Sequence, residues 1–336
     1  MGSRTLDIAT RTLRLASPFR ISGYVFETWD VVVATIAEGE HAGRGEGGGV
    51  YYLGDDVAHM LTAIETMRPA IEAGAGREEL REAMPAGGGR NALDCALWEL
   101  EAAQEGKPVW QLAGLDEPRP VRTTFTLGAD DPGAMAAKAL AYADARAIKV
   151  KLTGDLGLDL ARVEAIRVAR PDVWLGVDGN QGFTIGDLPA LADGLVRSGV
   201  AQLEQPLPRG REGELEGFSS PLPIAGDESV LTLSDVADAV GRFDIVNIKL
   251  DKCGGLTEGL LMASDARARG LGVMVGCMVG TSLAMAPAFL IGQSCDVVDL
   301  DGPTFLTEDP APAVTYRDGT IFASPTVWGA AGDTPA

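Results

Sequence analysis

Histidine is almost absent from this chain of 336 residues: only His41 and His59 occur, both in the first sixth of the sequence. A histidine-based zinc site, or a Ser–His–Asp triad in the C-terminal two-thirds, would need one of them. Any catalysis in that larger part of the chain must therefore rely on lysine and carboxylate side chains.

Positive charge and cysteine are also scarce. The 28 Lys and Arg residues face 48 Asp and Glu residues, which gives a formal net charge of -20. A surface this acidic repels phosphate backbones and anionic lipids, so we expect neither a nucleic acid nor a membrane as a partner. The four cysteines form no CxxC pair. We interpret them as reduced thiols in a cytoplasmic protein.

Long uncharged runs are rare, and one needs an explanation. Leu271 to Gly292 carries no charge and is long enough to cross a bilayer. However, it contains several glycines and Pro287, and it lies inside a repeating strand–helix pattern. We interpret it as a buried strand, loop and helix.

The first ~118 residues follow a pattern of their own. Apolar, β-rich runs at Thr5–Leu15 and Thr28–Ala37 predict paired strands. A helix is predicted over Asn91–Gln104, where apolar residues recur at i, i+3, i+4 and i+7. Between them, Gly43–Gly48 matches GxGxxG, but no helix opens directly after it, so a flexible loop is favoured over a dinucleotide site. These features predict a small α+β domain.

From about Val121 onward, short apolar runs alternate with longer amphipathic ones, which is typical of βαβ units and a parallel sheet. The predicted strands are Val121–Leu127, Ala147–Leu152, Val173–Asp178, Val200–Glu204, Leu222–Gly226, Asp244–Leu250, Leu271–Gly276 and Asp296–Leu300. Eight such strands close naturally into a TIM-type barrel. A doubly wound open sheet is the alternative fold, but its phosphate-binding loop is missing.

Carboxylates end three successive predicted strands, at Asp178, Glu204 and Asp227. The C-terminal ends of barrel strands meet at the mouth where catalytic residues gather. Three unpaired carboxylates there would repel one another, and Mg²⁺ prefers such oxygen ligands. The sequence therefore predicts an Mg²⁺ site held by these three residues.

Lysines flank the predicted metal. Lys149 and Lys151 are two residues apart on one strand, so both point to the same face. Their mutual repulsion should lower the pKa of at least one of them toward the range of a general base. Lys249 ends a strand four positions further round the barrel, across the mouth from this pair.

This arrangement suits removal of a proton α to a carboxylate, because Mg²⁺ can stabilise the charge of the resulting enediolate. A lysine on one face could take the proton while a lysine on the other face returns one. The carbon would then be inverted, as in a racemase or an epimerase.

The succession Lys149-Val150-Lys151, Asp178, Glu204, Asp227 and Lys249 resembles the enolase superfamily in its muconate-lactonizing branch, whose sites pair a base with Mg²⁺. The resemblance implies an N-terminal α+β capping domain at residues 1–118 and a modified (β/α)7β barrel at residues 119–310. A C-terminal segment, residues 311–336, would return to the capping domain.

Within that branch, the chain is similar to dipeptide epimerases of the L-Ala-D/L-Glu type. The similarity lies in Arg90–Trp98, Asn247–Glu258, Gly276–Met278 and Asp299-Leu300-Asp301. In that family an Asp-x-Asp on the last strand holds the substrate's α-ammonium group. Asp299 and Asp301 share one face, and a pair of carboxylates is a suitable seat for a cation.

The resemblance also implies substrate contacts from the capping loops. Tyr51 and Met278 are expected to contact the dipeptide. Family members that act on Ala-Glu place a basic side chain near the position of Gly23, and Arg20 is the candidate for that role here. The implied function is Mg²⁺-dependent epimerisation of an L-Ala-D/L-Glu-like dipeptide by two-lysine proton transfer, in a homo-oligomer.

Other functions remain open on the same scaffold. Cycloisomerisation and o-succinylbenzoate synthesis also use the lysines and the metal, but they leave the Asp299-x-Asp301 pair without an ammonium group to bind. A non-catalytic paralogue that binds a metal or a ligand is a further alternative.

Overall fold

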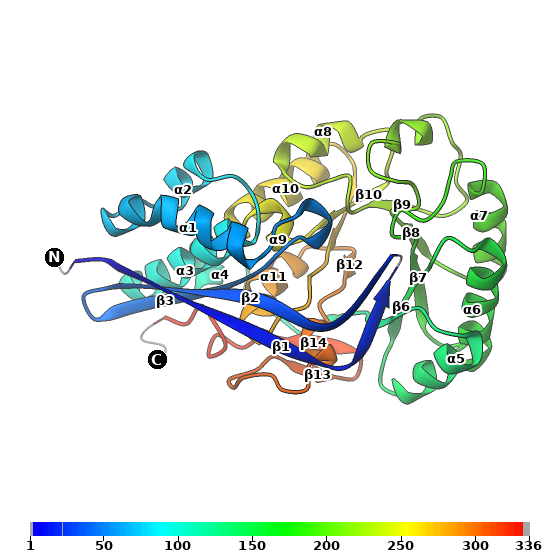
Figure 1. The fold of residues 1–336 in the computed structure, drawn as a ribbon, viewed down its shortest axis with the longest axis horizontal. Helices are drawn as coiled ribbons and strands as arrows, with labels where there is room; N and C mark the ends of the chain where they lie inside the picture. The colour runs from blue at the N-terminus through cyan, green and yellow to red at the C-terminus, as the bar shows by residue number, and fades with distance from the viewer. Residues whose placement is uncertain (1–2, 22, 332–336) are drawn as a thin grey trace.

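The computed structural model describes residues 3–21 and 23–331. An N-terminal antiparallel sheet with helices on one side packs against a larger, curled parallel sheet wrapped by helices (Figure 1). The predicted α/β architecture, a barrel with an α+β cap, is confirmed. Residues 332–336 of the predicted C-terminal segment lie outside the described part.

The capping sheet contains β1 (Thr5–Ile21), β2 (Tyr24–Glu38) and β3 (His41–Gly48), paired in sequence order. Both predicted strands are correct but too short. A register shift between Arg14 and Phe19 lets the β1–β2 hairpin continue beyond the expected ends. The extended tip reaches the barrel and carries aromatic side chains to its mouth (Figure 1).

The glycine-rich stretch is a strand, so the prediction of a flexible loop is wrong. Residues Gly43 to Gly48 belong to β3, which packs on helix α3 (Gly88–Glu105). A Cβ added at Gly43 would lie 2.1 Å from the backbone oxygen of Ala96. At Gly45 it would lie 2.1 Å from that of Ala92. The glycines therefore serve close strand–helix packing.

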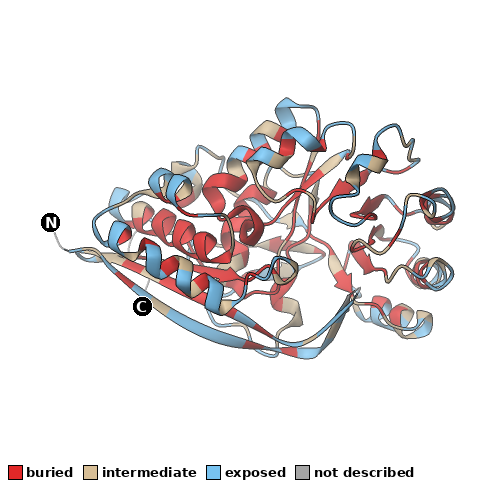
Figure 2. Cartoon of the chain, turned by 45° about the horizontal axis from the view of Figure 1, so that its top comes forward, coloured by how far each residue is buried: buried red, intermediate tan, exposed pale blue. Residues whose placement is uncertain are grey.

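Helix α3 confirms the predicted helix and extends it at the N-terminal end. It is buried on nearly all sides rather than on one stripe, as the red colour in Figure 2 shows. Helices α1 (Val57–Glu72) and α2 (Arg77–Ala83) cover it from the cap, and the barrel helices meet its other side. Its acidic residues Asp94 and Glu99 are 2% and 1% exposed. The helix thus joins the two parts of the molecule.

The large sheet has eight parallel strands that are neighbours in chain order. They are β5 (Phe125–Leu127), β6 (Ala147–Lys151), β7 (Trp174–Asp178), β8 (Gln202–Glu204), β9 (Ile224–Gly226), β10 (Ile245–Ile248), β11 (Gly272–Val275) and β12 (Val297–Val298). The first predicted strand, Val121–Leu127, is in fact two elements. β4 (Val121–Arg122) leaves the barrel and pairs elsewhere.

The barrel closes without a regular ladder between its first and last strands. The backbone N–H of Thr124 donates to the carbonyl of Val298 at 2.9 Å, and the N–H of Leu300 donates to the Thr123 hydroxyl at 3.0 Å. This junction places the residues after β12, among them Asp299 and Asp301, against those around β5.

Helices cover the outside of the barrel in the predicted alternation. They are α5 (Pro132–Ala141), α6 (Leu156–Ala169), α7 (Leu188–Arg197), α8 (Val236–Ala239), α9 (Leu250–Cys253), α10 (Leu256–Ala268) and α11 (Ser282–Gly292). Between β8 and β9 the helical element is a short 3-10 turn, η2 (Glu212–Leu215). Between the strands and the helices, alternate residues such as Ile148 and Val150 form the main apolar core.

The uncharged run Leu271–Gly292 folds as β11 and α11, as predicted. Among residues 3–21 and 23–331, no helix is both long and apolar enough to cross a membrane. All four cysteines are free.

The C-terminal segment forms the hairpin β13 (Thr315–Arg317) and β14 (Thr320–Phe322), whose second strand pairs with β4. Further on, the indole N–H of Trp328 donates to the backbone oxygen of Arg44 in the capping sheet at 2.9 Å. Residues 315–328 thus contact both the barrel, where the Tyr316 hydroxyl donates to the Leu300 carbonyl at 2.7 Å, and the cap.

Candidate active site

The barrel register places one basic and two acidic side chains in a row. Lys151 on β6 is paired with Asp178 on β7, which is paired with Glu204 on β8. Asp227 and Lys249 directly follow β9 and β10. Side chains at these strand ends point into the barrel because neighbours such as Val150 and Val177 occupy the outer, apolar face.

Three carboxylates converge at the barrel mouth. Asp178, Glu204 and Asp227 each place an oxygen within 4.8 Å of the others'. All three are buried, with at most 1% of their surface exposed. The residues predicted to bind a metal are therefore brought together.

Lysines surround this triad. The Lys151 ammonium lies 2.6 Å from Asp178, and that of Lys249 lies 2.6 Å from Asp227. Lys149 lies between, 2.9 Å from Glu204 and 3.2 Å from Asp178. The triad is thus paired at its two ends with lysines from strands on opposite sides of it.

Negative charge nevertheless exceeds positive charge at the mouth. The acidic groups are Asp178, Glu204, Asp227, Glu228, Asp299 and Asp301, and the lysines are Lys149, Lys151, Lys249 and Lys252. Burial and the charge of Asp178 raise the pKa of Glu204 to about 8. Burial and the charge of Asp227 raise the pKa of Glu228 to about 7. Full ionisation would need a further cation.

Buried oxygens beside the triad also lack a hydrogen-bond partner, among them Oδ1 of Asn180 and Oε2 of Glu228. Orphaned buried acceptors are costly unless a donor or a cation meets them. The donor set is all oxygen, the kind that Mg²⁺ prefers. The residues therefore fit a hard divalent cation.

The predicted lowering of a lysine pKa is wrong for Lys149. Burial disfavours its charged form, but the carboxylates of Asp299 and Glu204 outweigh burial and hold its pKa well above the usual lysine value. Lys249 behaves likewise: burial acts to lower its pKa, but Asp227, Glu204 and Glu228 together raise it further than burial lowers it. Attraction to the excess carboxylates is stronger than repulsion between the lysines.

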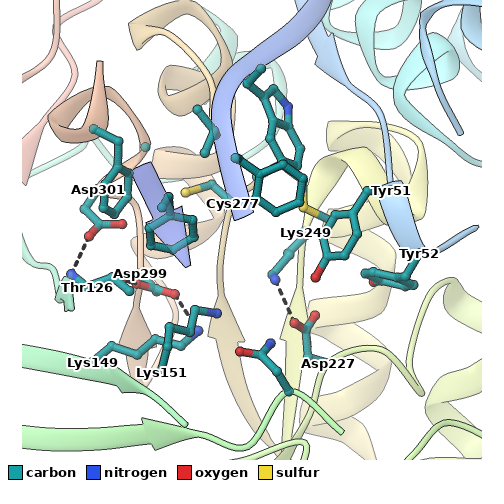
Figure 3. Close-up of a pocket in the computed structure, with 18 of the residues that line it drawn as sticks. Tyr51, Tyr52, Thr126, Lys149, Lys151, Asp227, Lys249, Cys277, Asp299 and Asp301 are labelled. Carbon is teal, nitrogen blue, oxygen red and sulfur yellow. Dashed lines mark hydrogen bonds and ion pairs between the residues drawn. The ribbon is translucent and has the colours of Figure 1, made fainter. Parts of the chain in front are cut away.

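The Asp299–Asp301 pair lies at the closing seam of the barrel, across the cavity from Lys249 (Figure 3). Asp299 accepts hydrogen bonds from the Thr124 hydroxyl and, at 2.8 Å, from Lys149. Asp301 accepts one from the backbone N–H of Thr126 at 2.6 Å. Burial and the charge of Asp299 raise the pKa of Asp301 to about 7, so Asp301 is short of positive charge.

The capping elements supply the opposite wall of the cavity. The predicted contacts of Tyr51 and Met278 with the dipeptide stay a prediction. Both residues line the cavity, Tyr51 from the 3-10 turn η1 (Tyr51–Leu53) and Met278 from the segment after β11. Arg20 does not: its side chain is exposed and outside the lining, which its neighbour Phe19 contributes to instead. The strand alternation of β1 turns Phe19 inward and Arg20 outward.

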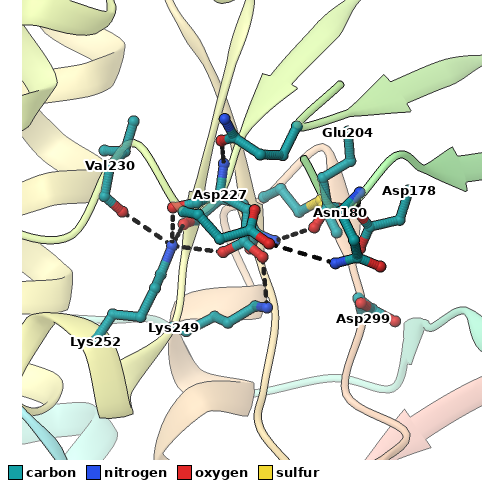
Figure 4. Close-up of polar contacts among 12 residues, drawn as sticks. Asp178, Asn180, Glu204, Asp227, Val230, Lys249, Lys252 and Asp299 are labelled. Carbon is teal, nitrogen blue, oxygen red and sulfur yellow. Dashed lines mark hydrogen bonds and ion pairs between the residues drawn. The ribbon is translucent and has the colours of Figure 1, made fainter. Parts of the chain in front are cut away.

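Sequence reasoning missed several residues of the site. Lys252 is fully enclosed and donates to Asp227 Oδ1 at 2.6 Å and to the Val230 carbonyl at 2.9 Å (Figure 4). It lies one helical turn past β10, where a lysine is ordinarily exposed, so no local signal marks it. Phe26 and Trp29 also line the cavity; Trp29 lies within the predicted strand Thr28–Ala37, and Phe26 lies just before it.

Known proteins are similar to this chain over most of its length. L-Ala-D/L-Glu epimerase of Escherichia coli K12 is 41% identical over 95% of this chain and 99% of its own. N-acetyl-D-glutamate racemase of a Pseudoalteromonas species is 41% identical over 72% of this chain and 76% of its own. The structure of dipeptide epimerase from Enterococcus faecalis, complexed with Mg and L-Leu-L-Tyr, superposes with a TM-score of 0.89 at 27% identity, covering 99% of both chains.

Two family models divide the chain between them. The model of the mandelate racemase/muconate lactonizing enzyme N-terminal domain matches residues 3–114, and the enolase C-terminal domain-like model matches residues 134–326. Together with the barrel, the cap and the carboxylate triad, these matches show that the chain belongs to the mandelate racemase/muconate lactonizing enzyme family of the enolase superfamily.

Proposed function

We propose that this protein is an Mg²⁺-dependent isomerase that epimerises a dipeptide at the α-carbon of its second residue. The observation that carries the proposal is the placement of Lys151 and Lys249 at the two ends of the carboxylate triad. The relatives named as epimerases and racemases support the same reaction class.

Asp178, Glu204 and Asp227 would hold the Mg²⁺ ion. When bound, the ion supplies positive charge next to the substrate carboxylate, where negative charge develops once the α-proton leaves. Asn180 and Glu228 carry unpartnered oxygens beside the triad and complete its polar surroundings.

Lys151 and Lys249 exchange the α-proton. One amine takes the proton from one face of the α-carbon, and the ammonium group of the other returns a proton to the opposite face, which inverts the centre. Lys151 is paired with Asp178 and Lys249 with Asp227. Positive charge at the triad would weaken both ion pairs, and it would lower the raised pKa of Lys249 toward the range of a general base. Lys149 remains a positioning residue that bridges Glu204 and Asp299.

Asp299 and Asp301 would hold the α-ammonium of the dipeptide. Asp301 carries most of this role because Asp299 already pairs with Lys149. The substrates of the alternative reactions, cycloisomerisation and o-succinylbenzoate synthesis, carry no ammonium group that Asp299 and Asp301 could bind.

Proton exchange in D₂O tests the proposal. A library of L-Xaa-L-Yaa dipeptides is incubated with the enzyme, and mass gain and chirality are read with Mg²⁺, after exhaustive chelation, and after Mg²⁺ is restored. We expect exchange and inversion that stop on chelation and return with Mg²⁺. Full turnover after chelation would remove the metal from the mechanism. N-acetylated amino acids are incubated in parallel with the dipeptides. Exchange confined to them would make the protein an N-acyl amino acid racemase.

A further inference from the structure

Four aromatic side chains form a continuous wall on the capping side of the cavity. Phe26 and Trp29 come from β2, and Tyr51 and Tyr52 from η1. Ring centroids are 4.9 Å apart for Phe26 and Trp29, 5.3 Å for Phe26 and Tyr51, and 5.1 Å for Tyr51 and Tyr52. Edge-to-face packing of this kind makes a firm apolar surface.

This aromatic wall stands over one end of the catalytic groups. Tyr51 and Tyr52 lie on the side of Lys249 and Asp227, whereas Asp299 and Asp301 lie on the other side of the cavity (Figure 3). The position of the wall therefore distinguishes the two ends of a bound dipeptide.

The four substituents of the reacting α-carbon determine which part of the dipeptide contacts the aromatic wall. Its carboxylate faces the triad, its nitrogen leads toward Asp301, and its proton faces a lysine. The remaining substituent is the side chain of the second residue, and the cap is the surface left for it.

The charges around the wall disfavour an acidic side chain there. Within the described residues, the basic groups that line the cavity are Lys149, Lys151 and Lys249, and each is paired with a carboxylate. The charge of Glu228 acts on both Tyr51 and Tyr52 and would repel another carboxylate. A cationic side chain would have to give up its water on an apolar surface, and Asp227 is already paired with Lys249 and Lys252.

We infer that the dipeptide's second side chain is large and apolar, with aromatic side chains preferred, and that Phe26, Trp29, Tyr51 and Tyr52 select it. This inference rests on the proposed epimerase function and narrows its substrate class, away from the Ala-Glu type of dipeptide.

The test compares four substrates that differ only in the second side chain: L-Ala-L-Phe, L-Ala-L-Ala, L-Ala-L-Glu and L-Ala-L-Lys. Deuterium incorporation and inversion are measured with Mg²⁺ to obtain kcat/KM. We expect kcat/KM for L-Ala-L-Phe to exceed kcat/KM for L-Ala-L-Glu by about tenfold to a hundredfold, which is the range of discrimination that an apolar pocket gives for one side chain.

Two variants of η1 assign the preference to the wall. Tyr51→Ala should lower the ratio of kcat/KM for L-Ala-L-Phe to that for L-Ala-L-Ala about tenfold, mainly through KM, and Tyr51→Phe should retain it. Leu53→Ala is the matched control, because Leu53 lies on the same turn, is 41% exposed and is not part of the lining. It should leave the ratio unchanged.

The outcomes separate the inference from the function beneath it. Inversion of L-Ala-L-Glu or L-Ala-L-Lys at a higher kcat/KM than L-Ala-L-Phe would overturn the aromatic preference and leave the epimerase intact. An unchanged ratio in Tyr51→Ala would remove Tyr51 from the selection. No exchange with any of the four dipeptides would contradict the proposed function itself.

Discussion

Two sets of carboxylates are buried in this molecule, but one set is paired with charged groups and the other with neutral hydrogen-bond donors. At the barrel mouth, Asp178 and Asp227 face lysine ammonium groups. At the joint between cap and barrel, the acids Glu46, Asp94 and Asp251 accept hydrogen bonds from neutral donors. The backbone N–H of Thr281 donates to Glu46 at 2.7 Å, that of Thr257 to Asp94 at 3.0 Å, and that of Gly48 to Asp251 at 2.8 Å.

Burial alone therefore does not mark a reactive acid. Burial acts to raise the pKa of Asp178, but Lys151 and Lys149 together outweigh it and lower the pKa to about 2. Burial instead raises the pKa of Asp94 to about 6 and that of Asp251 to about 7, since neutral donors offset it only in part. At the mouth, Asp178 and Asp227 are held charged by lysines, whereas the joint acids tie β3, α3 and the barrel helices together. Variants in the two sets should therefore fail in different ways.

The largest effect on turnover should come from the lysines that flank the mouth acids. Lys151→Ala and Lys249→Ala should each lower the rate of epimerisation by about 10²–10⁴. Each variant keeps one proton-transferring face, so each should still exchange the α-proton of one epimer in D₂O, and the two should prefer opposite epimers. Loss of exchange with the same epimer in both variants would refute the opposed arrangement.

A smaller effect is expected at the ammonium seat. Asp301→Asn removes one negative charge but keeps the acceptor for the Thr126 N–H. Because a hydrogen bond to a charged group contributes about 1.5–3 kcal/mol, KM for free dipeptides should rise roughly 10- to 100-fold, with little change in the melting temperature. N-acetyl dipeptides are the control, since they lack the ammonium group. Equal loss for free and acetylated substrates would contradict this seat.

The smallest effect on turnover is expected at the joint, where the change is in stability. The pKa of Asp251 is raised in the folded state. Its contribution to the free energy of unfolding is therefore fully present below its pKa in the unfolded chain, near 4, and is lost as the pH rises through about 7. Asp251→Asn removes this titration. The variant's free energy of unfolding, relative to the original protein, should therefore rise by a few kcal/mol between pH 4 and pH 8.

Urea unfolding across that pH range measures the difference. Asp227→Asn is the comparison from the mouth, where Lys249 and Lys252 lower the pKa of Asp227 despite burial. The stability that depends on this charge is lost only as pH falls below the unfolded value, near 4, so the difference for Asp227→Asn should stay nearly flat between pH 4 and pH 8. A flat difference for Asp251→Asn would show that this acid does not control joint stability.

Much of the mouth could be predicted from local sequence. The barrel alternation, with acids and lysines at strand ends, is a pattern of spacing, and the parallel register converts it directly into one row of side chains. The buried acids of the joint between cap and barrel could not be predicted from local sequence. Asp94 and Glu99 have the spacing of a solvent-facing stripe on an amphipathic helix, yet the barrel and β3 cover that stripe.

The sequence by itself determined the α/β barrel, the carboxylate triad and its lysines, because these depend on period-two strands whose ends meet at one mouth. Only the tertiary structure decided that Gly43–Gly48 is a strand, that Lys252 supports Asp227, and that Phe19 rather than Arg20 faces the cavity. Each of these depends on contact between segments far apart in the chain. The aromatic wall is the clearest case, since β2 and η1 are separated in the chain by β3 and meet only in the folded cap.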